Sequence, residues 1–240
     1  MILAALSLLL AMSTPDAVST LLNAKSSVPA VVYDAAWQQV KREADEGNPL
    51  QQFVIGVKTN DETVAKHYLD ASRKRIYDLA AQTDNALAWY LISVERSDVK
   101  LLHRAAELGN VQALNALGSM SVSRALSDPS YATNGLERIL AKSCGYFRQA
   151  AQKRDPNGYI NLGTCYLKGL GCKQDMAMAF ACFKAAAEAG HPEGMDNVSA
   201  CYQFGHGVRK DGELCLYWAM RGRASRGDEA AEKWLRERRQ

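Results

Sequence analysis

The chain has 240 residues, of which 48% are hydrophobic and 23% are charged, a composition that excludes an intrinsically disordered protein. The length exceeds that of a typical single domain, although an array of repeats can grow beyond it without dividing into domains. The net charge of +3 is too small to indicate nucleic-acid binding by itself, so no nucleic-acid partner is expected.

The beginning of the chain is predicted to be a signal peptide over residues 1–13, followed by a linker over residues 14–34. Met1–Met12 is apolar apart from one serine, and Ala11 and Ser13 are small residues near a cleavage point. The run is shorter than the about 20 residues of a transmembrane helix, so no transmembrane span is predicted. This pattern favours a periplasmic or secreted protein. Because no Lys or Arg precedes the run, a buried first helix in a cytoplasmic protein is the alternative.

Residues 35–240 are predicted to form an array of helix pairs, each opened by a residue able to cap a helix. A first unit lies near residues 43–79, where an Asn-Pro pair supplies a cap and a first helical residue. A second unit near residues 80–104 is short, so its inter-helix loop is expected to consist of Ser97-Asp98. The successive cap positions, spaced by 36, 26, 45, 36 and 36 residues, are Asn48, Asp84, Asn110, Asp155, His191 and Gly227.

The third unit, near residues 105–149, is the longest of the array. Its Asp-Pro and Asn-Gly pairs are turn signals and predict a surface loop over Ser121–Gly135. Because departures from a repeat often carry the specific function, Arg124 and Tyr131 in this loop are candidate partner-binding residues. A tolerated surface insertion is an equally good interpretation.

The fourth and fifth units, near residues 150–185 and 186–221, repeat each other at a shift of 36 residues. Glycines, prolines and aromatic residues rarely coincide by chance over a whole window. The coincident pairs are Ala151 and Ala187, Pro156 and Pro192, Gly158 and Gly194, Cys165 and Cys201, Tyr166 and Tyr202, Gly169 and Gly205, Gly171 and Gly207, and Asp175 and Asp211.

Each of these units predicts two antiparallel helices with their apolar faces turned inward. In the fourth unit, Asp155 is expected to cap helix A and Asp175 to cap helix B. Gly169 and Gly171 break the chain between them and allow the positive φ of a tight turn. Small residues on the stripe of helix A should let a neighbouring backbone approach closely. This stripe consists of Gly158, Leu162, Gly163 and Tyr166.

A C-terminal capping helix is predicted over residues 222–240. From Arg209 onward there are nine Lys or Arg and six Asp or Glu, a difference equal to the surplus of the whole chain. One interpretation is a weakly basic patch for an acidic partner. The simpler and preferred one is a solvated helix end, with cations near the negative pole of the helix dipole.

Three segments resemble Sel1-like repeats, which are related to tetratricopeptide repeats. They are AAELGNVQALNALGSM (105–120), NLGTCYLKGLGCKQDMAMAFACFKAAAEAG (161–190) and ACYQFGHGVRKDGELCLYWA (200–219). The resemblance is strong over Leu101–Leu235 and faint over Ala35–Lys100. The G-x-G-V loop of the family is kept at 205–208, whereas Cys172 replaces the valine in the preceding loop.

The resemblance implies an all-α, right-handed superhelical solenoid of antiparallel helix pairs with a concave groove. It also implies a non-enzymatic adaptor that binds a protein or peptide, in signalling, envelope assembly or host–bacterium contact. The family has no shared catalytic residues, so none is carried over to this chain.

The six cysteines and four histidines show no recognisable pattern of a chemical site. No C-x-x-C, H-E-x-x-H, G-x-S-x-G or phosphate-loop motif occurs. A site of Cys165, Cys201 and His206 is conceivable, but cysteine packed as a small hydrophobe is the simpler interpretation. Some secreted Sel1-like proteins link the two helices of each repeat by disulfides. Here Cys182 falls on Trp218 at the shift of 36, so mostly free, buried thiols are expected, with no cofactor and no metal.

A binding scaffold is therefore the function that the sequence favours. The exposed side of the A helices supplies the candidate site, which consists of Asn161, Thr164, Lys168, Asn197 and Phe204. An exposed Phe204 beside polar neighbours would suit a peptide-sized ligand. The alternative is a cysteine-containing envelope hydrolase related to β-lactamases. A serine hydrolase needs a nucleophile next to a base, and the single S-x-x-K match in the chain, Ser97–Lys100, falls at the predicted inter-helix loop.

Overall fold

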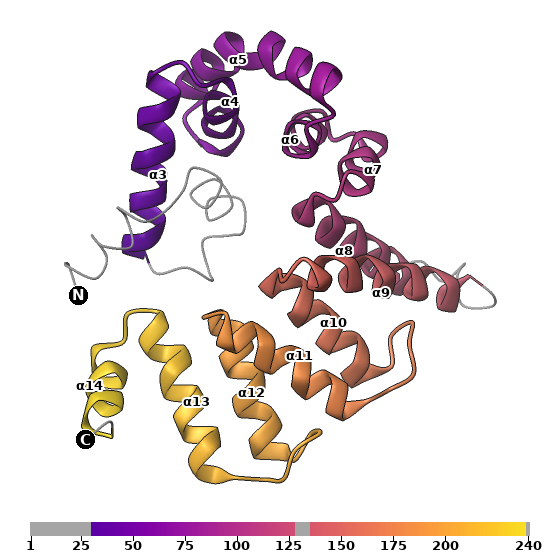
Figure 1. Ribbon diagram of the computed structural model, residues 1–240, viewed down its shortest axis with the longest axis vertical. Coiled ribbons are helices and arrows are strands. Elements are labelled where there is room, and N and C mark those ends of the chain that lie inside the picture. Colours follow the sequence, from indigo (N-terminus) through magenta and orange to yellow (C-terminus); the bar gives the residue numbers. More distant parts are fainter. Residues whose placement is uncertain (1–29, 128–134, 239–240) are drawn as a thin grey trace. The chain divides into compact units, whose positions relative to one another are not determined.

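The computed structural model describes residues 30–127 and 135–238, and this part of the chain contains twelve α-helices and no strand (Figure 1). The predicted all-α architecture of antiparallel helix pairs is confirmed. The helices fall into two compact units, Met1–Ala113 and Leu114–Gln240, which we term the N-terminal and C-terminal units. Among the described residues, no helix combines the length and the apolar character needed to cross a bilayer.

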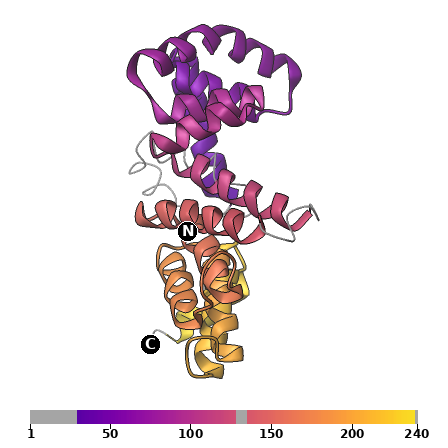
Figure 2. The ribbon, with the colours of Figure 1, turned by 90° about the vertical axis from the view of Figure 1, so that its right-hand side faces the viewer.

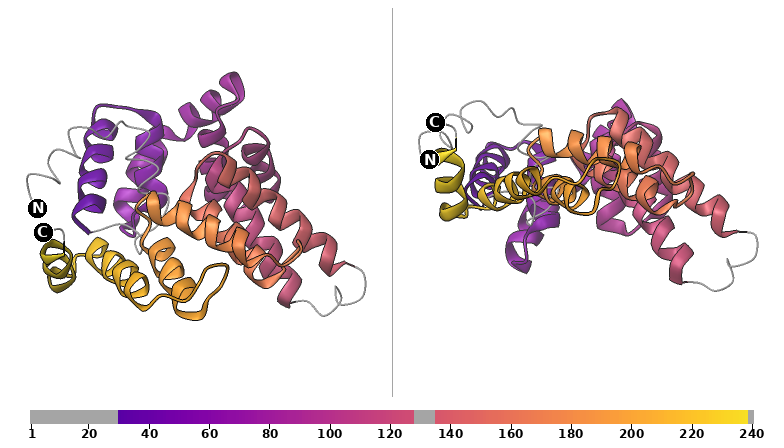
Figure 3. Two further views of the ribbon diagram at one scale, coloured as in Figure 1. Left: turned by 60° about the horizontal axis from the view of Figure 1, so that its bottom comes forward. Right: turned by 90° about the horizontal axis from the view of Figure 1, so that it is seen from below.

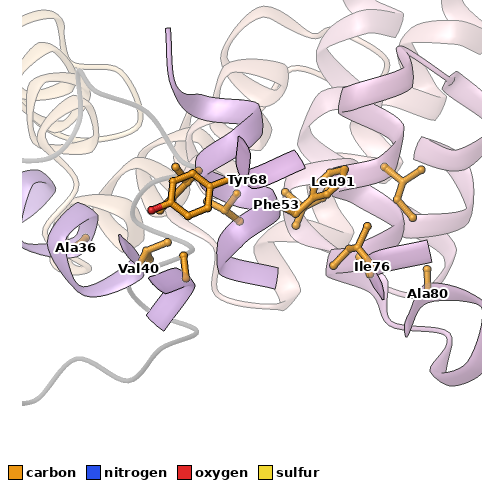
Figure 4. Packing of buried hydrophobic residues seen from close by; sticks show 12 residues of the cluster. Ala36, Val40, Phe53, Tyr68, Ile76, Ala80 and Leu91 are labelled. Carbon is orange, nitrogen blue, oxygen red and sulfur yellow. The ribbon is translucent and has the colours of Figure 1, made fainter. Parts of the chain in front are cut away.

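The N-terminal unit is a succession of helices in which each packs against the next, while α4 also contacts α6. Its helices are α3 (Ala30–Asp45), α4 (Pro49–Lys58), α5 (Glu62–Thr83), α6 (Ala86–Arg96) and α7 (Val99–Glu107). Four successive helices each supply a residue to one core, namely Val40, Phe53, Ile76 and Leu91, all at most 1% exposed (Figure 4). The unit is held together by this apolar contact between neighbouring helices.

Short polar residues begin the helices of this unit, as their positions in the sequence predict. Asn48 caps α4 and accepts a hydrogen bond from an amide of the first turn at 3.1 Å, with Pro49 as the first helical residue. The connection between α6 and α7 is the predicted Ser97-Asp98, in which Asp98 caps α7. Each cap satisfies an amide that has no partner within its helix.

Two predictions for the N-terminal unit are corrected. The cap of α6 is Asn85, because Asp84 ends α5 in the left-handed region at φ 47° and its carboxylate lies 2.8 Å from Arg104. Helix α3 begins at Ala30, inside the predicted linker over residues 14–34. The earlier part of that linker and the predicted signal peptide lie outside the described residues.

The C-terminal unit continues the same alternation of helices, and the boundary between the units falls inside α8. Its helices are α8 (Val111–Ser127), α9 (Leu136–Gln152), α10 (Pro156–Lys168), α11 (Met176–Glu188), α12 (Pro192–Phe204), α13 (Gly212–Ser225) and α14 (Glu229–Glu237). From α9 to α14 each helix packs against the next, and α10 also contacts α12. Figures 2 and 3 show α10 to α13 side by side from further directions.

Close packing in this unit depends on the small residues that the sequence singled out. A β-carbon at Gly163 would lie 2.7 Å from Cε1 of Phe183. A β-carbon at Gly158 would lie 2.7 Å from the amide nitrogen of Ala151, on the preceding helix. Both distances are shorter than van der Waals contact, so α10 approaches α11 and α9 more closely than any larger residue would allow.

The predicted loop over Ser121–Gly135 is wrong in its first half. Helix α8 continues to Ser127, and the Ser121 hydroxyl donates to a carbonyl of its own helix at 2.7 Å. Arg124 is therefore an exposed residue near the helix end, and Tyr131 lies outside the described residues. No Gly or Pro interrupts residues 121–127, and Ala125 continues the buried face of α8, so the helix has no physical reason to stop earlier.

The caps of the C-terminal unit follow the predicted register with one exception. Asp155 accepts the Gly158 amide at 2.8 Å, and Asp175 accepts an amide of α11 at 2.9 Å. The exception is Gly227, whose predicted role belongs to Asp228, which accepts an amide of α14 at 3.0 Å. Glycine has no side chain to accept a bond, and Gly227 instead turns the chain at φ 90°.

Candidate functional site

Four of the predicted binding residues lie at equivalent positions of α10 and α12, which contact each other. Asn161 and Asn197 are equivalent at the shift of 36, and both are half-buried. Lys168 and Phe204 are the next equivalent pair; each is the last residue of its helix and is exposed. The structure thus places these side chains on neighbouring A helices.

Two of the predicted residues make internal hydrogen bonds. The Thr164 hydroxyl donates to a backbone carbonyl of α10 at 3.0 Å. The Asn161 amide donates to Oδ1 of Asn115 at 3.4 Å, and the Asn115 amide donates to Oδ2 of Asp155 at 2.7 Å. These bonds join α8 to the capped start of α10, so Asn161 and Thr164 serve the packing of the repeats. The sequence did not identify Asn115, because its partner lies 40 residues away.

Phe204 is the aromatic residue among those predicted site residues that the structure describes. Its side chain is 55% exposed, and its ring stacks on that of His206 with the centroids 5.6 Å apart. The helix ends directly after it because Gly205 adopts the left-handed conformation at φ 79°. An aromatic ring at the exposed end of a helix is available to a ligand without any rearrangement of the core.

A hollow of about 420 Å³ lies along the turn that follows Phe204. It is lined by Tyr202, Val208, Arg209, Lys210, Asp211 and Leu214. The turn folds back on its own helix, where the Asp211 amide donates to the Tyr202 carbonyl at 3.1 Å. The Asp211 carboxylate accepts two amides of α13, at 3.0 and 2.9 Å. The hollow therefore combines apolar walls with two exposed cations, and its one carboxylate is engaged in capping.

A second hollow, of about 680 Å³, lies in the N-terminal unit. It is lined by Asp70, Arg73, Lys74, Tyr77, Glu95 and Arg96. Its charges pair with one another: Arg73 lies 2.8 Å from Glu95, and the Tyr77 hydroxyl donates to Glu95 at 3.3 Å. Burial is the first cause that raises the pKa of the Tyr77 hydroxyl, and the Glu95 carboxylate is the second.

The described residues show no arrangement typical of catalysis or metal binding. Among them no group of three or more His, Cys, Asp or Glu side chains is suited to a metal ion. Buried serines donate to backbone carbonyls, Ser72 at 2.6 Å, Ser143 at 3.1 Å and Ser199 at 2.9 Å. The Cys/His site considered in the sequence analysis is not formed, because the thiols of Cys165 and Cys201 belong to different core clusters.

Comparison with known proteins identifies the repeat. The Sel1 repeat family model matches residues 99–110, 156–191 and 192–219, the last two of which cover α10 and α11, and then α12 with the first part of α13. The chain carries Sel1 repeats. The resemblance seen in the sequence is thereby confirmed. Sel1 repeat proteins are generally scaffolds for protein interaction.

Individual relatives cover different shares of this chain. It is 34% identical over 107 residues to the ERAD-associated E3 ubiquitin-protein ligase component HRD3B of Arabidopsis thaliana, over 35% of this chain and 18% of that protein. The chain thus spans less than a fifth of that relative's length. A solved Sel1 repeat protein from Oxalobacter formigenes is 27% identical, with a TM-score of 0.45, over 52% of this chain and 88% of the other.

The protective antigen c5321 of uropathogenic Escherichia coli, which displays an SLR fold, is similar over a larger part of the chain. It is 21% identical with a TM-score of 0.53, over 84% of this chain and 45% of the other. At this identity the similarity speaks for the fold alone, and it supports a helical solenoid.

The cap of α12, like Gly135 before α9, makes no side-chain hydrogen bond to its helix. His191 begins α12 and is 9% exposed, but its side chain accepts no amide, and neither ring nitrogen has a partner among the described residues. Burial lowers the pKa of the His191 imidazole, against the raising effect of Glu193 and Asp155, whereas Arg226 adds to the lowering. Two buried, unpaired nitrogens destabilise the folded state.

We expect His191→Asn to raise the free energy of unfolding by about 1 kcal/mol at pH 7.5, because asparagine can accept the free amide. The difference from wild type should grow at lower pH. The folded pKa of His191 is below the unfolded value of 6.5, so the unfolded chain binds the proton first as the pH falls below 6.5. Urea unfolding of both proteins at pH 7.5 and 5.5 measures the effect.

His191→Ala is the matched control for this substitution. It removes the buried nitrogens without adding a cap. The loss of stability that protonation of His191 causes between pH 7.5 and 5.5 should therefore disappear, as it does with asparagine. The gain in the free energy of unfolding should be smaller than with asparagine. A His191→Asn protein that is less stable than wild type at both pH values would show that the imidazole is satisfied by groups outside the described contacts.

Proposed function

We propose that the chain is a non-enzymatic scaffold that binds a peptide segment of a partner protein at Phe204 and the adjoining hollow. The observation that carries this proposal is the exposed aromatic ring beside a concave surface with apolar walls. Aromatic anchors next to pockets, surrounded by polar residues, dominate the binding energy of protein interfaces. The Sel1 repeats support the same general function.

The charges around the hollow suggest the chemistry of the bound segment. Arg209 and Lys210 are exposed at its edge, and Lys168 is exposed at the equivalent end of α10. The hollow is lined by two cations and one carboxylate, and that carboxylate is turned to the amides of α13, so the charge that the hollow presents to a ligand is positive. We therefore propose a segment that places an apolar side chain in the hollow and an acidic side chain or a terminal carboxylate beside the cations.

We further propose that the protein acts in the periplasm or is secreted. This rests on the apolar run of residues 1–13 and on its small residues, which are typical of an exported precursor. The mass of the protein isolated from its native host tests this proposal. A cleaved N-terminus near residue 13 supports it, and an intact chain recovered from the cytoplasm contradicts it.

Replacement of Phe204 by alanine should lower the affinity for the partner at least tenfold, which is about 1.4 kcal/mol. The melting temperature should stay unchanged, because the side chain is mostly exposed. A photo-crosslinking amino acid at position 204 would capture the partner in the native host, and titration calorimetry with that partner would then give the affinities.

Leu126→Ala is the matched control for the binding measurement. Leu126 is 66% exposed on α8, so its removal deletes a comparable exposed apolar side chain without touching the hollow. Equal affinities of the wild type and the Phe204→Ala protein, or an equal loss in both variants, would contradict the proposed site. Loss with Phe204→Ala alone would support it.

A further inference from the structure

Four of the six cysteines gather in one place in the C-terminal unit. Cys144 of α9, Cys165 of α10 and Cys182 of α11 are buried in one cluster, and Cys172 of the loop between α10 and α11 packs against it. All six thiols are free in this structure. Neither the proposed binding surface nor the packing of the common repeat explains why so many thiols meet here.

Cys144 lies at the centre of this thiol cluster. It shares the buried cluster with Cys165, Cys172 packs against that cluster, and Cys144 contributes to the raised pKa of both neighbouring thiols. The Arg148 guanidinium, one turn further along α9, lies 3.9 Å from the Cys144 sulfur. Two thiol neighbours of Cys144 are therefore candidates for covalent pairing.

The loop that carries Cys172 is fixed against the helix that carries Cys144. A β-carbon at Gly171 would collide with the backbone of Leu140 and Ala141, one turn before Cys144. Gly171 itself has φ 68°, a conformation that holds the turn in place. The contact between Cys144 and Cys172 thus follows from the path of the backbone.

The next repeat contains the same contact with different residues. At the shift of 36, Cys144 corresponds to Phe180 and Cys172 to Val208, and both of these apolar side chains pack against one core cluster. Gly207 meets Met176 there, just as Gly171 meets Leu140. Both members of this loop-to-helix contact are therefore cysteine in one repeat and apolar in the next.

Cys165, unlike Cys144 and Cys172, is repeated as a cysteine in the next repeat. Its equivalent at the shift of 36 is Cys201, which is also buried, so cysteine at this position belongs to the packing of both repeats. Cys144, Cys172 and Cys182 are the cluster cysteines that are not repeated at this shift, and of the two possible partners of Cys144, Cys172 is half-buried whereas Cys182 is buried. This distinction favours Cys172 over Cys165 as the partner of Cys144.

We propose that Cys144 and Cys172 form a disulfide, which joins α9 to the α10–α11 loop, when the protein meets a small-molecule disulfide such as oxidised glutathione. The Cys172 thiolate attacks one sulfur of the small disulfide, whose S–S bond breaks and releases one thiol. The Cys144 thiolate then attacks the mixed disulfide at the Cys172 sulfur and releases the second thiol. Two protein thiols are thereby oxidised, and one small disulfide is reduced to two thiols.

The order of these steps follows from exposure. Cys172 is half-buried and within reach of a small reagent, whereas Cys144 is 1% exposed. Burial raises the pKa of the Cys172 thiol to about 11, the neighbouring Cys144 adds to this, and Arg148 opposes it. Because only the thiolate attacks, the reaction should be slow at pH 7 and should speed up about tenfold per pH unit up to pH 9.

The full chain, purified under reducing conditions and then incubated with glutathione disulfide, tests this proposal. Free thiols are blocked with N-ethylmaleimide, and digestion followed by mass spectrometry identifies the linked peptides. We expect a peptide pair joined through Cys144 and Cys172, and a melting temperature about 5–10 °C higher than that of the reduced protein. Cys172→Val, which restores the residue of the next repeat, should fold normally and lose both effects.

Cys215→Ala is the control, because Cys215 lies outside the thiol cluster and its sulfur lies 3.4 Å from the Ser199 hydroxyl. It should leave the disulfide and the rise in melting temperature unchanged. A link between Cys144 and Cys165, or mixed glutathione adducts without any internal link at pH 9, would overturn the proposal. Neither outcome would affect the proposed binding at Phe204.

Discussion

Replacement of Gly163 by leucine is expected to lower the free energy of unfolding of the C-terminal unit by about 3 kcal/mol, the upper end of the effects of overpacking. The β-carbon alone would lie 2.7 Å from Cε1 of Phe183 and 3.2 Å from the β-carbon of Cys182. Phe183 is 2% exposed, so its ring has no free space to move into. Urea unfolding followed by circular dichroism measures the loss.

Gly145→Leu is the matched control, because it introduces the same side chain into a helix of the same unit. No atom lies within 4 Å of a β-carbon at Gly145, so nothing opposes the added side chain. Leucine is also a better helix former than glycine, and the variant should gain about 0.5–1 kcal/mol. If both variants lose stability equally, the contact between α10 and α11 is not the cause.

The parts of the fold that the sequence predicted correctly depend on local signals. Asp155 and Asp175 were identified as caps because a capping side chain bonds to an amide two or three residues away. Ser97-Asp98 was predicted as a connection because only two residues separate the ends of the two helical patterns. Caps and short connections can therefore be predicted from a few neighbouring residues alone.

The errors arose where the local signal was ambiguous. Asp84 and Asn85 are both able to cap a helix, and only the backbone conformation decides between them. The turn residues that follow Ser127 show where a loop is able to form, but they do not show how far α8 continues before it. The register of the array was therefore right within one residue, whereas the length of α8 was not.

The candidate site was predicted only in part, because its geometry depends on contacts between distant residues. Phe204 follows from its equivalence with Lys168, which requires only the repeat shift. The hollow requires the turn to fold back so that the Asp211 amide meets the Tyr202 carbonyl, and no pattern of residues indicates its volume. The bond between Asn115 and Asp155 likewise joins two repeats, so a single repeat does not predict it.

Replacement of Gly171 by alanine should lower the free energy of unfolding by about 3 kcal/mol, from two causes that a second variant separates. Gly171 has φ 68° and Gly190 has φ 86°, so alanine at either position adopts an unfavourable left-handed conformation, at about 1–2 kcal/mol. At Gly171 the β-carbon also collides with the backbone of Leu140, which cannot rotate away as a side chain would.

Gly190→Ala isolates the first cause, because no atom lies within 4 Å of a β-carbon at that position. We expect it to lose only about 1–2 kcal/mol, and the difference between the two variants then measures the contact between the α10–α11 loop and α9. Urea unfolding of both proteins gives the comparison. Equal losses would mean that the loop moves away from α9 without resistance. In that case the displaced loop would carry Cys172 away from Cys144, and the Gly171→Ala protein should form the disulfide more slowly than wild type.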